Sequence, residues 1–313
     1  MYSRRLLRIK TFQALYSLDI NTEQSDKALS SLIQKNIDNT YICYLLVWQY
    51  LLALADYAKT HQRIVEAKYI KDQTQELSFE NVYENSFVQN LRNDESFRLL
   101  GSKYHLKNYI DENLVKSTFL KLLKEPNIES ILNAPRNKSS EKKLIKFFLK
   151  KGIVEDPSVQ EYFVETFLSW YDDDEFVINK LMTSLTLFFE TDPKGRFPLY
   201  TFDLQEAYAF AINLYKQYRD HLVEIDEVIQ PHLKNWDSDR INSVDHVLLR
   251  QALVEMLYCP EVPLKVTINE YVDISKEYST AKSKEFINGL LDTIMKVLQK
   301  QQKIVKTGRG LVE

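Results

Sequence analysis

Three amphipathic helical patterns follow one another in residues 226–292, with signals for a helix end between them. Asn242 offers a capping side chain before the first pattern. Pro260 and Pro263 separate the first pattern from the second, because proline lacks an amide donor and its ring clashes with the preceding turn. Ser279 and Thr280 are expected to cap the third helix. Such a stretch predicts three consecutive helices and excludes a sheet in this part of the chain.

The helical spacing also predicts which residues of these three helices face a core. The expected inward residues are Val244, Val247, Leu248, Leu253, Met256, Leu257, Val266, Ile268, Val272, Ile274, Phe286, Ile287, Leu290, Leu291, Ile294 and Leu298. Gly289 lies in the middle of the third helix, where glycine costs about 1 kcal/mol relative to alanine. We therefore expect a close neighbour at Gly289.

The rest of the chain is poor in the residues that make turns. Only 6 glycines and 8 prolines occur in 313 residues, while 44% of the residues are hydrophobic. Long helices around proper cores follow, so the fold class is all-α. The two cysteines, Cys43 and Cys259, lack metal-ligand spacing and are expected to be reduced and buried.

The first expected helix, residues 3–19, combines arginines with aromatic residues. Arg5, Arg8, Phe12 and Tyr16 recur at spacings of three, four and four, with no acidic residue before Asp19. Guanidinium groups hold phosphates and stack on bases, so this pattern suits RNA. A solvated helix start with aromatic residues in the core fits the same spacing, and the spacing alone favours this second interpretation.

Four segments carry a resemblance to a known family. They are Leu-Leu-Arg-Gln-Ala to Glu-Met-Leu (248–257), Val-Pro-Leu-Lys-Val-Thr-Ile-Asn-Glu (262–270), Phe-Ile-Asn-Gly-Leu-Leu-Asp (286–292), and the arginine-rich start with Gln-Ala-Leu-Tyr (13–16). The first three, in chain order and at family-like spacing, resemble successive signatures of the NusB transcription antitermination family. The arginine-rich start resembles the N-terminal pattern of the same family. The resemblance covers about residues 1–20 and 202–295.

The resemblance implies a fold and a mode of action. The family fold is two small helical bundles, and its arginine-rich segment contacts single-stranded RNA of the boxA type. Arg4, Arg5, Arg8 and Gln13 occupy the matching positions, although Leu6 stands where relatives often have a third consecutive arginine. With the ribosomal protein NusE, such a factor tethers nascent ribosomal RNA to the RNA polymerase elongation complex and suppresses termination.

Four further residues are assigned roles by the resemblance. Tyr16 and Asp245 are expected to face the protein partner, although an acidic residue in the first turn of a helix is favoured in any case. Lys282 and Lys284, at the start of the last helix, are expected to add phosphate contacts.

The domain organisation follows from the two separated parts of the resemblance. Residues 1–40 are expected to be the N-terminal helices of the NusB-like domain and residues 201–300 its C-terminal bundle. Residues 41–200 are expected to be a helical insertion, and residues 301–313 a basic tail whose last residues are frayed. Within the insertion, the acidic run at 172–175 is expected to cap a helix beginning near Phe176. A lysine row around Lys142, Lys146 and Lys150 fits a solvated face or a longer RNA path.

No catalytic motif is recognisable in the sequence. Glycine-rich phosphate loops, paired Cys-x-x-Cys, His-Glu-x-x-His and nucleophile elbows are missing, so we expect neither an enzyme, nor a metal site, nor a cofactor.

The apolar run at 41–58 is interrupted by Gln49 and Asp56 and predicts a buried helix rather than a membrane span. No signal peptide is recognisable, so the expected location is the cytoplasm. Glu270 is expected to pair with Arg250.

A second functional class remains open. A helical protein-interaction module without any RNA function, dominated by the insertion, would use the many aromatic residues (19 tyrosines and 16 phenylalanines) for a protein-binding groove. Salt-dependent RNA binding would separate the two classes, since binding to phosphates weakens as salt rises.

Overall fold

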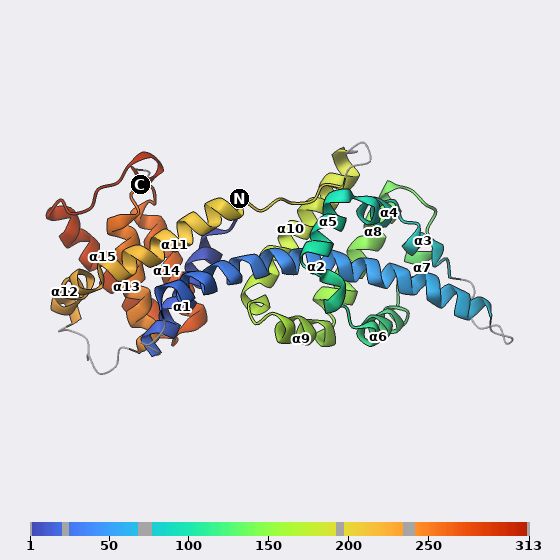
Figure 1. The fold of residues 1–313 in the computed structure, drawn as a ribbon, viewed down its shortest axis with the longest axis horizontal. Helices are drawn as coiled ribbons and strands as arrows, with labels where there is room; N and C mark the ends of the chain where they lie inside the picture. Colours follow the sequence, from blue (N-terminus) through green and yellow to red (C-terminus); the bar gives the residue numbers. More distant parts are fainter. Residues whose placement is uncertain (1, 21–24, 68–76, 192–196, 234–241, 312–313) are drawn as a thin grey trace. The chain divides into compact units, whose positions relative to one another are not determined.

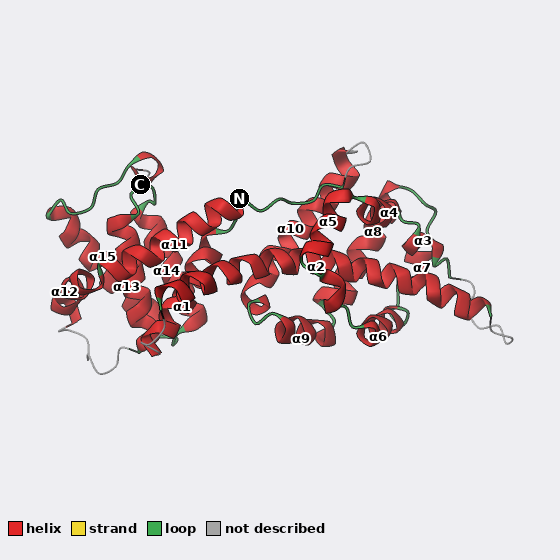
Figure 2. Ribbon diagram, in the orientation of Figure 1, coloured by secondary structure: helices red, strands yellow, loops and turns green. Residues whose placement is uncertain are grey.

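The computed structural model describes residues 2–20, 25–67, 77–191, 197–233 and 242–311. Throughout this described part the secondary structure is helical and no strand occurs, so the predicted all-α class is confirmed (Figure 2). The helices form two compact units. Unit 1 comprises Met1–Ile37 and Asp203–Glu313, and unit 2 comprises Asp38–Phe202. Unit 2 contains residues 41–200, for which the sequence predicts a helical insertion.

Unit 1 is built around one helix that is buried on almost every side. Its helices are α1 (Arg4–Ile20), the start of α2 (Asp26–Glu66), α11 (Leu204–Asp220), α12 (Leu222–Leu233), α13 (Ser243–Tyr258), α14 (Leu264–Tyr278) and α15 (Ser283–Lys300). Helices α1, α11, α14 and α15 all pack on α13 (Figure 1). Because α13 is surrounded, its residues from Gln251 to Met256 are all buried, including the charged Glu255.

The predicted helix ends in unit 1 are partly confirmed. Asn242 caps α13, its side-chain oxygen accepting from the backbone N–H of Asp245 at 2.8 Å. Pro263 stands at the N-cap of α14, one position earlier than predicted. The predicted cap of the third helix is wrong, because α15 begins at Ser283 with Lys282 at its N-cap and no side-chain cap.

Two of the predicted inward contacts in unit 1 are also wrong. Val266 is 42% exposed, because the neighbours of α14 lie on the side of Ile268 and Ile274, both of which are buried. A Cβ atom added at Gly289 would meet nothing within 4 Å, so no close neighbour explains this glycine. The spacing of apolar residues identifies a helix reliably, but the width of its buried face depends on which helices pack against it.

Unit 2 is organised along the remainder of α2. Its other helices are α3 (Glu80–Tyr83), α4 (Ser86–Asn93), α5 (Glu95–Lys103), α6 (Glu112–Leu122), α7 (Ile128–Leu132), α8 (Lys138–Leu149), α9 (Pro157–Thr166) and α10 (Trp170–Thr191), with short turns of helix at Leu106–Tyr109 and Lys150–Val154. Trp48 of α2 packs on Phe87 and Phe197 in an aromatic core. Helix α2 is long and apolar enough to cross a membrane, but 72% of its most apolar window is buried inside the protein. Burial of this kind is the pattern of a core helix, as predicted for residues 41–58.

Two predictions for the insertion need correction. Helix α10 begins at Trp170, so the acidic run at 172–175 lies inside its first turns rather than before it. Acidic side chains in a first turn still favour the positive end of the helix dipole. The polar composition of residues 73–85 also predicts a loop, but this stretch falls partly outside the described residues, and its described part contains the short helix α3.

The basic tail is packed against unit 1 and is not frayed over residues 303–311. The backbone N–H of Thr307 donates to the carbonyl oxygen of Pro260 at 3.0 Å. The amine of Lys306 donates to the carbonyl oxygen of Cys259 at 2.9 Å, at the C-terminal end of α13, where a cation is favoured. Burial lowers the pKa of Lys306. The two last residues lie outside the described part of the chain.

Gly310→Ala is expected to release this tail. A Cβ atom at Gly310 would lie 2.0 Å from the carbonyl oxygen of Pro260, so the backbone must move and the Thr307 bond is lost. We expect faster hydrogen exchange at the Thr307 amide and a free energy of unfolding lower by about 1 kcal/mol. The matched control, Gly289→Ala, meets open space in a helix and should raise the free energy of unfolding by up to about 1 kcal/mol. Equal effects of the two substitutions would contradict the docked tail.

Candidate RNA and partner interface

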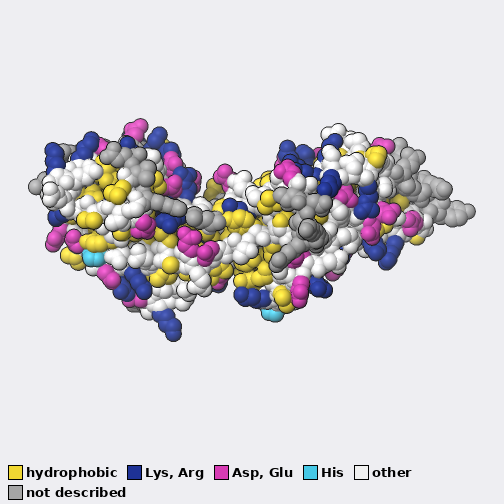
Figure 3. Space-filling view, turned by 90° about the horizontal axis from the view of Figure 1, so that it is seen from above, with side chains coloured by type: hydrophobic (Ala, Val, Ile, Leu, Met, Phe, Trp, Pro, Cys, Tyr) yellow, Lys and Arg dark blue, Asp and Glu magenta, His cyan; other side chains and the backbone are white. Residues whose placement is uncertain are grey.

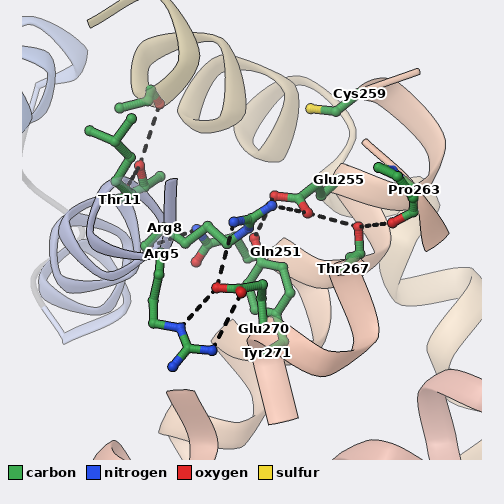
Figure 4. A network of polar contacts seen from close by, with 12 residues as sticks. Arg5, Arg8, Thr11, Gln251, Glu255, Cys259, Pro263, Thr267, Glu270 and Tyr271 are labelled. Atoms are coloured by element: carbon green, nitrogen blue, oxygen red, sulfur yellow. Dashed lines mark hydrogen bonds and ion pairs between the residues drawn. The ribbon is translucent and has the colours of Figure 1, made fainter. Parts of the chain in front are cut away.

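The N-terminal arginines of α1 are bound by acidic residues of the helices around them. Arg5 donates from Nε to Glu270 of α14 at 3.0 Å (Figure 4). It also donates from Nη2 to Asp273 of the same helix at 2.8 Å. The side chain of Arg5 remains 40% exposed. Its hydrogen bond to Glu270 is the largest contribution that raises the pKa of Arg5. An RNA phosphate could therefore reach Arg5, but it would compete with two carboxylates.

Arg8 lies in the core of unit 1. Its side chain is 2% exposed and its guanidinium donates to both oxygens of Glu255 of α13, at 2.7 and 2.9 Å. Thr267 and Tyr271 donate to the same carboxylate, and Gln251 donates to the carbonyl oxygen of Arg8 (Figure 4). Burial opposes the charge of Arg8, yet the attraction of Glu255 outweighs burial and its pKa is raised. The resemblance predicts Arg8 at the RNA surface, but the structure buries its side chain in the core of unit 1.

Arg4 is the second half-exposed arginine of α1. Its guanidinium lies 3.6 Å from the carboxylate of Glu206 and stacks over the ring of Phe210, with 4.8 Å from its Cζ to the ring centroid. Both partners belong to α11. A charge pair at 36% and 41% exposure is worth little, on the order of 1 kcal/mol or less, so Arg4 is readily available to another anion.

Further along α1, aromatic contacts connect the predicted partner residue to the end of α14. The ring of Tyr16 lies 6.0 Å from that of Phe12, and Phe12 makes an edge contact with Tyr278 at 5.5 Å. Phe12 is buried, whereas Tyr16 and Gln13 are half-buried. Arg5 thus lies beside the middle of α14 and Tyr16 lies near its end, so α1 follows α14 towards the α14–α15 turn.

The predicted residues Asp245, Lys282 and Lys284 come together at that turn. Ser283 donates from its hydroxyl to Asp245 Oδ2 at 2.7 Å, and Asn242 donates to the same oxygen at 3.2 Å. Asp245 is 4% exposed, and its Oδ1 has no hydrogen-bond partner among the described residues. Lys282 and Lys284, on either side of Ser283, are exposed and form no ion pair with any residue that the structure describes.

The predicted pairing of Glu270 with Arg250 is wrong. Arg250 donates to both oxygens of Asp226 on α12 at 2.7 Å, whereas Glu270 binds Arg5. The position of Glu270 on α14 turns it towards α1 instead of α12. Sequence analysis also missed Glu255 and Asp273. A lone glutamate inside the apolar run of α13 was the available signal, because a buried carboxylate requires a cationic or hydrogen-bonding partner.

Four of the predicted cationic residues of unit 1 are accessible to solvent. Arg4 and Arg5 of α1 and Lys282 and Lys284 near the start of α15 are at least partly exposed. Within the described ranges no group of three His, Cys, Asp or Glu side chains could hold a metal ion. On the face drawn in Figure 3, Lys and Arg side chains lie among Asp and Glu side chains rather than in one basic expanse. Anion binding by this surface would depend on a few local cations.

Neither cysteine forms a disulfide and both are buried, as predicted. Cys259 lies at the end of α13, and burial, the largest cause, raises the pKa of its thiol to about 12. A thiol of this kind is inert at neutral pH.

Comparison with known proteins identifies the C-terminal part of the chain. The NusB family model matches residues 192–296. Transcription antitermination proteins NusB from Salinibacter ruber and Chloroherpeton thalassium are 43% and 39% identical over 103 and 108 residues, which cover 33% and 34% of this chain. The protein of the same name from Desulfatibacillum aliphaticivorans is 48% identical over 83 residues, 26% of the chain. No solved structure matches the chain.

These matches have definite limits. They span 64%, 51% and 58% of the lengths of the three relatives, and the family model reaches neither α1 nor unit 2 apart from its last residues. Unit 2 is therefore extra to the family domain. Helices α11 to α15, which pack around α13 and carry the Asp245 and Lys282 turn, fall in or largely in the matched segment. Residues 192–296 of this chain form a domain of the NusB family.

Proposed function

We propose that this protein is a non-enzymatic transcription antitermination factor that binds RNA through unit 1. The family match over residues 192–296 is the observation that supports this function best. The RNA would be a boxA-like segment of a nascent ribosomal RNA. NusE would bind beside it, and the pair would act on the RNA polymerase elongation complex at ribosomal RNA operons. This work requires no cofactor and no membrane, and its location would be the cytoplasm.

Four cations would make the phosphate contacts. Arg4 and Arg5 are half-exposed on α1, and Lys282 and Lys284 are free of ion pairs with described residues at the start of α15. Gln13, half-buried on the same helix as the arginines, would hydrogen-bond a base. Arg8 would act indirectly: its pair with Glu255 fixes α1 against α13 and so orients Arg4 and Arg5. In this proposal Arg4 and Arg5 contact RNA and Arg8 positions them, whereas the resemblance implied that all three contact RNA.

Tyr16 and Asp245 would receive the protein partner. The buried Oδ1 of Asp245 has no hydrogen-bond partner among the described residues, and an unsatisfied buried acceptor costs roughly 1–3 kcal/mol. A donor from NusE would remove this cost once the α14–α15 turn moved to admit it. Half-buried Tyr16 would supply apolar contact area with a hydroxyl at its tip.

The decisive experiment measures RNA binding at several salt concentrations, with and without NusE. The probes are a single-stranded boxA RNA and a scrambled RNA of the same composition. We expect Arg4→Ala/Arg5→Ala and Lys282→Ala/Lys284→Ala each to weaken binding. Each double variant should also reduce the slope of log affinity against log salt by about 1.4, which corresponds to two lost phosphate contacts on a single strand. NusE should strengthen binding to the boxA RNA alone.

The variants are chosen so that a folding defect does not imitate an RNA defect. Arg8 is left intact, because its removal would strand the buried Glu255. Lys296→Ala/Lys300→Ala, near the other end of α15, is the matched control and should leave the salt slope unchanged. Equal affinity for the two RNAs, with no effect of NusE, would contradict an antitermination role. It would favour the alternative class, a helical interaction module without RNA function.

A further inference from the structure

The junction between α9 and α10 in unit 2 exposes two large apolar side chains. Leu168 is 84% exposed and Tyr171 is 81% exposed, more than any other large apolar residue in the described part of the chain. Their chain neighbours Phe167 and Trp170 are buried, at 6% and 1% exposure. The exposure therefore belongs to an anchored turn, whose two buried aromatic residues hold the other two side chains in solvent.

Backbone hydrogen bonds also fix this turn. The N–H of Trp170 donates to the carbonyl oxygen of Phe167 at 2.8 Å, and the N–H of Asp173 donates to that of Ser169 at 3.0 Å. The indole of Trp170 donates to the side chain of Gln160 on α9 at 2.9 Å. A partner would meet a preformed surface, so little conformational entropy would be lost on binding.

The chain segment that forms this junction carries acidic charge of a single sign. Residues 161–175 contain six acidic residues and no Lys, Arg or His. Asp173 is buried and accepts from Thr40, but Glu161 and Glu175 are exposed, as is Glu165. These three glutamates form no ion pair with a described residue. The pKa of Asp174 is raised, first by burial and then by repulsion from Glu175, Asp173 and Asp172. The local negative charge is thus poorly compensated.

An acidic surface with an apolar centre restricts the class of partner. RNA and anionic lipid would both be repelled by it, since they carry negative charge themselves. Two copies of this chain could not pair through it symmetrically, because acidic surfaces would face each other. The chemistry that fits is a chain segment rich in lysine and arginine that also presents aliphatic or aromatic residues.

We propose that the α9–α10 junction of unit 2 is a docking surface for a basic protein segment with apolar anchors. Leu168 and Tyr171 supply the apolar contacts at the centre, and tyrosine is among the residues that most often dominate binding energies. Glu161, Glu165 and Glu175 form the polar rim, which steers the basic partner and fixes its register. The surface lies outside the family domain and makes unit 2 an interaction module beside the RNA-binding unit.

The test uses the full chain and three fluorescein-labelled synthetic peptides of equal length. The first alternates lysine and arginine with leucine and phenylalanine. The second has serine in place of the apolar residues, and the third has glutamate in place of the basic ones. Fluorescence anisotropy should show binding of the first peptide, at least tenfold weaker binding of the second and none of the third. A photo-crosslinker on the first peptide should mark residues 161–175.

Variants then locate the binding site. Leu168→Ser/Tyr171→Ser and Glu161→Gln/Glu165→Gln should each weaken binding of the first peptide at least tenfold. All four side chains lie at the surface or in an exposed turn, so the fold should be unaffected. The matched control is Leu99→Ser/Glu95→Gln on α5, an exposed leucine with an exposed glutamate one turn away, which should change nothing.

Three outcomes would overturn the docking surface. They are equal binding of the first two peptides, equal sensitivity to the control variant, and loss of RNA binding in Leu168→Ser/Tyr171→Ser. The last outcome would assign the surface to RNA instead of protein. Failure of the antitermination role leaves this test unaffected, because the peptides probe unit 2 and the RNA probes unit 1.

Discussion

Arg8→Met is expected to lower the free energy of unfolding of unit 1 by about 3–5 kcal/mol, a large part of the stability of a small domain. Methionine fills much of the volume of the arginine stem, so the loss comes chiefly from charge. Glu255, 0% exposed, would keep only Thr267 and Tyr271 as donors and would remain a buried carboxylate without a cation. Hydrogen exchange of α13 amides, followed through urea unfolding, measures the effect in unit 1 separately from unit 2.

A second substitution distinguishes the lost ion pair from lost packing. Arg8→Met/Glu255→Met removes both charges and should recover most of the stability, since a buried pair replaced by apolar side chains is often neutral or stabilising. Arg4→Met, at a pair with Glu206 whose side chains are 36% and 41% exposed, is the control and should cost on the order of 1 kcal/mol or less. If Arg8→Met cost no more than this control, the Arg8–Glu255 pair would not hold α1 in place.

Much of the fold of unit 1 could be predicted from local patterns. Asn242 before an apolar helical run, and Pro260 with Pro263 after it, define α13 and the start of α14 to within a residue. The patterns do not reveal which helices pack against each other. Val266 fits the apolar stripe of α14 and yet faces solvent, because burial is decided by packing between helices and not by spacing along one of them.

The helices that carry the candidate residues were predictable, but the contacts of those residues were not. The predicted arginines lie on α1, and the predicted lysines lie near the start of α15. The partners of the arginines were not predictable, since Arg5 and Glu270 stand 265 residues apart in the chain and Arg8 and Glu255 stand 247 apart. A helix-local rule could not find these pairs. Two acidic residues three apart on α14, Glu270 and Asp273, gave the only hint of an acidic face towards another helix.

Glu270→Gln/Asp273→Asn is expected to increase the affinity for single-stranded RNA about tenfold. Each carboxylate is partly exposed, and each pair with Arg5 is worth up to about 1 kcal/mol at such a site. Removing both would add about 1.4 kcal/mol to binding, which is one factor of ten. The amides keep the shape of the two side chains. Arg8 loses its 3.7 Å ion pair with Glu270 but retains Glu255 at 2.7 Å, so the core should keep its packing. Filter binding at low and moderate salt measures the change.

An increase in affinity is an informative result, because most substitutions at a binding surface weaken binding. Asp273 also pairs with Lys276, whose release would add a cation to the same face of α14. Asp292→Asn, which frees Lys296 on the opposite part of α15, is the control for a gain in general positive charge and should change affinity much less. An unchanged affinity in Glu270→Gln/Asp273→Asn would show that Arg5 makes no RNA contact. If the gain in RNA affinity disappears when Arg5→Ala is added, the acidic residues of α14 weaken RNA binding by competing for Arg5.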